Sequence, residues 1–165
     1  MELEIDFDGP WPSSADWPPL ADEAANAAAR AAPELAHPRL TASLLFTSDA
    51  EVHTLNREWR GKDKPTNVLS FPMLERAELL ALGGMGEGDS PPELLGDIAL
   101  AYETCAREAA EKGIRLEHHA AHLIIHGLLH LAGYDHETSA QDAAEMEALE
   151  IKALAMMGIA DPYCD

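Results

Sequence analysis

The sequence predicts an α+β fold in which one small sheet of about four strands packs with about five helices. Three observations support this class. Strand-like and helix-like segments are mixed along the first two thirds of the chain, several helices follow at the end, and no internal repeat or linker separates them. We expect residues 1–165 to form a single domain, because a chain of this length can bury a hydrophobic core of its own.

The first half of the chain alternates strands and helices. Residues 2–7 alternate acidic and apolar side chains, which is the period of a half-buried strand. A turn region rich in Pro and Trp at 9–19 precedes an alanine-rich helix from about 20 to 32, and residues 39–47 are expected to form a second strand. Ser48 can cap a helix that runs to about Trp59, with Glu51 at the capping-box position.

The second half adds two strands and three helices. Residues 68–71 form a short strand closed by Pro72, and residues 83–92 form a glycine-rich flexible loop. This loop is no P-loop, because no Gly-Lys-Ser/Thr follows it. A strand is expected at 94–101, and helices at about 102–112, 116–132 and 138–157.

Three histidines near the end of the 116–132 helix predict a metal site. His126 and His130 are four residues apart and share one helical face. Gly133 can adopt the positive φ that ends a helix, so that His136 can return toward the same point. Three imidazoles suit one zinc ion per chain and leave a fourth position for water, which is typical of a catalytic zinc site.

The spacing of this site coincides with the metzincin protease pattern, with one difference. Gly127 stands where those proteases carry the glutamate that acts as general base. The same metal geometry is therefore expected to serve another reaction. The histidines at 118, 122, 126 and 130 could instead form only a polar stripe; we expect His122 to support the site and His118 and His119 to be solvated.

Charge limits the nucleic acid that this chain could bind. The net charge is −19, which argues against a general nucleic-acid-binding protein. Four of the 11 basic residues nevertheless lie within 57–64. Arg60, Lys62 and Lys64 are therefore candidates for a phosphate clamp beside the histidines, although a solvated loop is the alternative.

Four segments resemble the bacterial YbeY family of rRNA maturation factors and single-strand-specific endoribonucleases. They are Leu55-Asn-Arg-Glu-Trp-Arg60, Lys62-Asp-Lys-Pro-Thr66 with Val68-Leu-Ser-Phe-Pro72, Leu95-Gly-Asp-Ile98, and His126 to His136, and they occur in the family's order. The resemblance implies zinc on the three histidines, Arg60 as the catalytic arginine, and RNA, notably the 3′ end of the 16S rRNA precursor, as substrate. The family usually has Asp at the position of Asn67, a position that we expect only to open a strand.

The proton acceptor of such a reaction stays open in the sequence. Metal-activated water could attack unaided, or the RNA 2′-OH could be the nucleophile. Asp97 and Asp135 could orient a ligand imidazole through its other nitrogen. Alternatively, Asp97 serves a strand and Asp135 closes a turn.

Two other readings of the function stay open beside the endoribonuclease. One is a metzincin-like metalloprotease, and the other is a non-catalytic, metal-stabilised ribosome-assembly factor. Ribosomal small-subunit proteins are further expected partners in ribosome biogenesis. No apolar run is long enough to cross a bilayer and the acidic N-terminus does not resemble a signal peptide, so we expect a cytoplasmic protein.

Overall fold

The sheet has four strands in the part of the chain that the computed structural model describes, which is residues 1–13, 15–82, 91–135 and 138–163. The strands are β1 (Glu2–Asp8), β2 (Leu40–Thr47), β3 (Val68–Pro72) and β4 (Glu93–Ala101). Their order across the sheet is β1-β2-β4-β3. The pairs β1–β2 and β2–β4 are parallel, whereas β3 is antiparallel to β4. The expected sheet of about four strands is confirmed.

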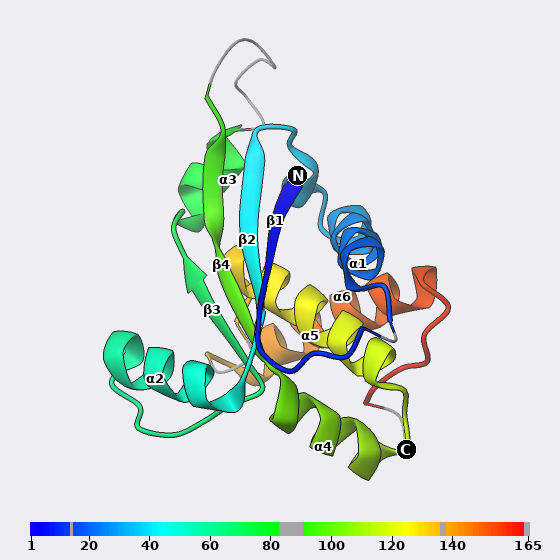
Figure 1. Cartoon of the computed structure of the whole chain (residues 1–165). Helices are drawn as coiled ribbons and strands as arrows, with labels where there is room; N and C mark the ends of the chain where they lie inside the picture. Colours follow the sequence, from blue (N-terminus) through cyan, green and yellow to red (C-terminus); the bar gives the residue numbers. More distant parts are fainter. Residues whose placement is uncertain (14, 83–90, 136–137, 164–165) are drawn as a thin grey trace.

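Helices cover both faces of this sheet unequally (Figure 1). The described residues form α1 (Trp17–Ala31), α2 (Asp49–Arg60), α3 (Arg76–Leu82), α4 (Tyr102–Lys112), α5 (Leu116–Leu131) and α6 (Ala140–Met156), with a short 3-10 helix at Pro33–Ala36. Helices α1, α5 and α6 pack together on one face, and α2 lies against β3 and β4 on the other. The α+β class is therefore confirmed, with α3 as a helix beyond the expected five.

The core lies mainly between the sheet and α5. Leu44 and Phe46 of β2 point into a large cluster with Ile124 and Leu128 of α5. A smaller apolar cluster on the opposite face contains Val52 of α2 together with residues of β3 and β4. Because α2 covers only part of that face, exposed apolar side chains remain beside it.

One helix begins earlier than the sequence predicts and another was not predicted, both for local reasons. Helix α1 begins at Trp17 rather than at about residue 20, because prolines are accommodated in its first turn. Helix α3 was not predicted, since its seven residues offer too little periodicity to separate it from a loop.

The expected loop at 83–92 lies outside the described residues except for its last two prolines. Within the described ranges, the helices are too short or too polar to span a membrane.

Candidate metal and nucleic-acid site

Helix α5 ends as the glycine in its sequence predicts. Gly133 has a φ of 101°, and its N–H donates to the carbonyl of His130 at 3.0 Å. The N–H of Tyr134 donates to the carbonyl of Leu129 at 3.1 Å, completing a Schellman turn. The chain thus turns back directly after the helix. His136, the expected third ligand, lies outside the described residues.

One cavity of about 500 Å³ brings most of the predicted site residues together. It lies where the loop after α2, the start of β3, α4 and α5 meet. The predicted residues that line it are Arg60, Lys62, Lys64, His122, His126, His130 and Asp135. The basic segment and the histidines, separated by at least 58 positions in sequence, therefore share one space.

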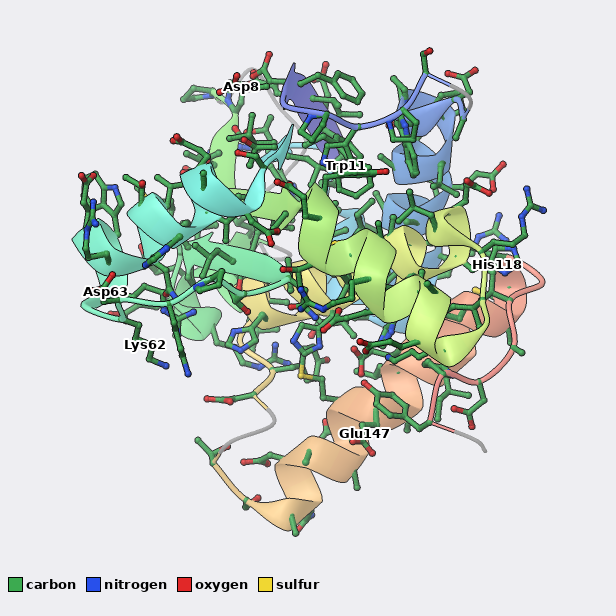
Figure 2. The ribbon with its side chains drawn as sticks, turned by 60° about the horizontal axis from the view of Figure 1, so that its bottom comes forward. Asp8, Trp11, Lys62, Asp63, His118 and Glu147 are labelled. Carbon is green, nitrogen blue, oxygen red and sulfur yellow. The ribbon has the colours of Figure 1, made fainter. Side chains whose placement is uncertain are left out.

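Asn56 shapes the basic loop of this cavity. Its side chain is only 2% exposed, and its Nδ2 donates to the carbonyl of Lys64 at 2.8 Å. The backbone carbonyl of Asn56 accepts from the N–H of Lys62 at 3.1 Å. Figure 2 shows Lys62 and Asp63 at the outer edge of the molecule, next to α2. Two contacts from one buried residue thus hold the loop that carries the lysines.

Glu150 is a functional residue that sequence reasoning missed. This side chain of α6 is 1% exposed, and its Oε1 lies 2.8 Å from His126 Nδ1 and 3.2 Å from His122 Nε2. The Tyr163 hydroxyl donates to its other oxygen at 2.7 Å. Burial alone would raise the pKa of Glu150, but the hydrogen bonds with His122 and His126 hold it at about 2. The sequence analysis named Asp97 and Asp135 as carboxylates that could orient a histidine. The carboxylate that contacts His126 is Glu150 of α6, which no local sequence pattern distinguishes.

The described histidines fit a metal ion chemically. When the ionised Glu150 carboxylate accepts the Nδ1–H of His126, Nε2 is the ring nitrogen that could bind a metal. The ring of His130 lies one helical turn further, with ring centroids 5.8 Å apart. In the described ranges, no group of three or more possible ligands gathers, and the third expected ligand is outside them. Two imidazoles of the expected set are therefore placed on one cavity.

Gly127 faces the sheet rather than the cavity. A Cβ at this position would meet the side chain of Ile98 at 3.0 Å. Glycine thus allows α5 to pack closely on β4. A glutamate at the same position would be directed at Ile98, so the protease base is excluded by packing as well as by residue type.

The structure separates the two aspartates that were candidates for orienting a histidine. Asp135 lines the cavity, whereas Asp97 is exposed and lines a second, mostly apolar hollow with Leu55, Trp59 and Phe71. Asp97 and the histidines therefore do not meet in one cavity.

His119 corrects another expectation, because its side chain is 1% exposed rather than solvated. It lies 2.9 Å from Glu108, with which it lines the cavity. Burial lowers the pKa of His119 even though Glu108 acts to raise it. The sequence could have indicated this pair only if the two residues were three or four positions apart on one helix. Glu108 and His119 instead lie on different helices, α4 and α5.

A comparison with known families decides where this chain belongs. A family model described as Endoribonuclease YbeY matches residues 14–158. The chain belongs to the YbeY family. Proteins of that name from Erythrobacter litoralis and Novosphingobium aromaticivorans are 64% and 58% identical to it. These alignments cover 100% and 98% of this chain and 99% and 95% of the relatives.

A solved structure supports the fold of this YbeY-family chain. The solution structure of TM1509 from Thermotoga maritima matches it with a TM-score of 0.55 and 22% sequence identity. The match covers 98% of this chain and 100% of the other. At this identity the likeness concerns the arrangement of helices and strands.

Proposed function

We propose that this protein is a zinc-dependent endoribonuclease that cuts single-stranded RNA, and that it acts in 3′-end maturation of 16S rRNA during ribosome biogenesis. The observation that carries the proposal is the shared cavity, in which Arg60 and two lysines lie with His126 and His130. The relatives named Endoribonuclease YbeY support RNA as the substrate class.

The residues of this chain would divide the work as follows. His126, His130 and His136 would hold zinc, which when bound lowers the pKa of water toward ~7 and polarises a phosphoryl oxygen. Glu150 keeps the proton of His126 on Nδ1. Arg60 would bind the phosphodiester and stabilise negative charge on its oxygens, while Lys62 and Lys64 would bind neighbouring phosphates.

Arg60 gives the sharpest test of this assignment. Arg60→Ala is expected to keep zinc, measured by elemental analysis, and to lower kcat/KM on single-stranded RNA by about a hundredfold or more. Arg57→Ala is the matched control, because Arg57 is an exposed residue of the same helix outside the cavity lining. Full activity of the Arg60 variant would remove this residue from the mechanism.

The same assay separates the rival functions. Metal-loaded protein is incubated with a labelled single strand, with the same RNA annealed to its complement, and with casein. Cleavage of the single strand alone is expected. Cleavage of casein would support a metalloprotease, which the packing of Gly127 against Ile98 disfavours. Binding of RNA without any cleavage would support a non-catalytic assembly factor.

A further inference from the structure

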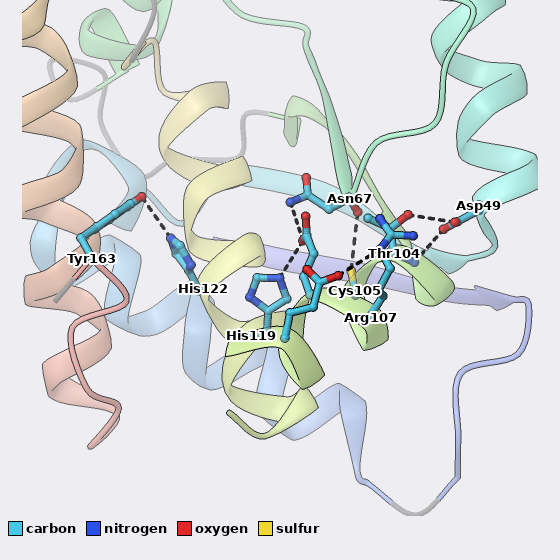
Figure 3. Close-up of polar contacts among 10 residues, drawn as sticks. Asp49, Asn67, Thr104, Cys105, Arg107, His119, His122 and Tyr163 are labelled. Carbon is cyan, nitrogen blue, oxygen red and sulfur yellow. Dashed lines mark hydrogen bonds and ion pairs between the residues drawn. The ribbon is translucent and has the colours of Figure 1, made fainter. Parts of the chain in front are cut away.

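A carboxylate lies at the end of the cavity away from the expected metal position and has no role in the proposed reaction. Glu108 of α4 accepts hydrogen bonds at Oε1 from His119 Nε2 at 2.9 Å and from Asn67 Nδ2 at 2.9 Å. Figure 3 shows the two donor side chains, His119 and Asn67, pointing toward one another. All three residues line the cavity, together with Lys112. Both contacts to Glu108 come from side chains on other elements, so the carboxylate is held in a defined place.

The charge state of this group is set by its surroundings. Burial would raise the pKa of Glu108, but its hydrogen bonds with His119 and Asn67 lower it. Burial lowers the pKa of His119. At neutral pH an ionised Glu108 therefore accepts a hydrogen from a neutral His119, and this end of the cavity carries a fixed negative charge beside Lys112.

A fixed negative charge is unsuited to phosphate but suited to a nucleobase. A carboxylate repels the backbone of RNA, whereas it accepts hydrogens from the amino groups of cytosine, adenine and guanine. Uracil presents a carbonyl at the position where cytosine carries its amino group. Single-stranded RNA is read through such base edges, because its bases are unpaired.

The distance along α5 places this carboxylate within reach of a neighbouring nucleotide. The ring centroids of His119 and His122 are 6.3 Å apart, and those of His122 and His126 are 6.5 Å apart. His119, the hydrogen-bond partner of Glu108, thus lies about two helical turns from His126, and all three residues line one cavity. Lys112, four residues after Glu108 on α4, offers a cation for the phosphate of the same nucleotide.

We propose that Glu108, braced by Asn67 and His119, forms a nucleobase subsite that selects a base bearing an amino group, tested most simply as cytosine over uracil, at one position beside the cleaved bond. The inference rests on the proposed function. It names a preference that the phosphate contacts cannot supply, because Arg60, Lys62 and Lys64 contact a backbone common to all sequences.

Glu108→Gln is the decisive variant. The amide oxygen of Gln can still accept from Asn67 and His119, while the new NH₂ group replaces an acceptor by a donor. Glu111→Gln is the matched control, because Glu111 is an exposed residue of the same helix that pairs only with Arg107 among the described residues, at 3.9 Å. Thermal unfolding of each variant checks that the fold is retained.

The measurement uses short RNAs that differ at a single position as cytosine or uracil, with the variable base moved stepwise past the cut. The native protein should favour cytosine at one position by about fivefold or more in kcat/KM, in line with 1–3 kcal/mol for a base contact. Glu108→Gln should abolish or reverse this ratio, and Glu111→Gln should keep it.

Two results would overturn the subsite. They are equal cleavage of cytosine and uracil RNAs at every position by the native protein, or an unchanged ratio in Glu108→Gln. Either result leaves the endoribonuclease proposal standing, since cleavage is still seen. Absence of any RNA cleavage by the metal-loaded protein would instead contradict the proposed function itself.

Discussion

Glu150 shows how one buried carboxylate can prepare two histidines at once. Its Oε1 lies within hydrogen-bond distance of His122 and His126, and its Oε2 accepts from Tyr163. Burial and the hydrogen bond to Glu150 both raise the pKa of Tyr163, so its hydroxyl stays protonated and remains a donor. The carboxylate is therefore ionised and held toward both histidines.

Removing this charge should weaken metal binding. Glu150→Gln is expected to lower zinc affinity by about 10–100-fold, because partners of this kind fix the tautomer and basicity of a ligand. Competition with a chromophoric chelator measures the affinity. Glu145→Gln, on the exposed side of the same helix, should leave it unchanged. Equal affinities in both variants would remove Glu150 from the metal site.

The pair formed by buried His119 and partly buried Glu108 predicts a dependence of stability on pH. Burial holds the folded pKa of His119 below its usual 6.5, so the unfolded chain takes up this proton first. Its contribution to stability is present above pH 6.5 and is lost as the pH falls below that value. Urea unfolding at several pH values should show this decline.

An NMR titration of His119 tests the cause directly. The imidazole should titrate below 6.5, and Glu108→Gln should lower its pKa further, because the carboxylate acts to raise it. A pKa at or above 6.5 in the native protein would contradict the assignment of His119 as a neutral buried donor.

At the scale of elements, the turn after α5 is held from outside. Arg76 of α3 donates to the carbonyl of Ala132 at 2.6 Å and to Glu34 at 2.8 Å, and its guanidinium lies 4.7 Å from the ring centre of Tyr134. Tyr134 also donates to Glu34 at 3.0 Å. Helix α3 thus supports the turn that leads toward His136.

Gly133→Ala should therefore be more harmful than an ordinary helix-end substitution. Its φ of 101° disfavours a side chain, and the new Cβ would meet Arg76 at 3.0 Å, so we expect a loss of about 1–3 kcal/mol together with weaker zinc binding. Gly113→Ala is the control, since Gly113 also has a positive φ but open space around it. Zinc affinity that falls equally in both variants would argue against a specific role of this turn.

Sequence reasoning succeeds here where the signal is local. The bounds of α4, the Ser48 cap and the turn at Gly133 all depend on residues a few positions apart, and the structure confirms them. It could also be expected that Arg60 and His126 line the same cavity. The resemblance to one family linked their two segments, which the local sequence patterns alone do not connect. Their catalytic and metal-binding roles stay predictions.

Contacts between distant elements were beyond the sequence. Glu150 sits in a helix whose acidic residues look alike until packing buries one of them against His126. Likewise, nothing local distinguishes His119 from a solvated histidine before α4 places Glu108 beside it. Asp97 has the opposite fate, since β4 directs it to the face away from the histidines.

At the scale of the whole molecule, a chain of net charge −19 concentrates cations at one cavity. Arg60, Lys62, Lys64 and Lys112 are four of its 11 basic residues and all line that space. Acidic residues dominate residues 1–36 and 137–165. We therefore expect RNA to be attracted to this cavity and repelled by the rest of the surface.

This distribution predicts a shallow salt dependence of RNA binding. With about four phosphate contacts on a single strand, the slope of log K against log salt should be about −3. Fluorescence anisotropy with a short labelled RNA between low and high salt measures the slope. A slope of −6 or steeper would require a larger basic surface than the described residues provide.

The apolar hollow beside α2 gives the molecule an optical reporter. Trp59 lies in that hollow and is 72% exposed, whereas Trp11 and Trp17 are buried in the core. Acrylamide should therefore quench chiefly the emission of Trp59. Trp59 and the cavity lined by Arg60 and His126 belong to separate hollows. RNA bound in that cavity should therefore leave the quenching largely unchanged, while a protein that covers the apolar hollow should suppress it. The fluorescence of one residue thus tells which side of the molecule a ligand occupies.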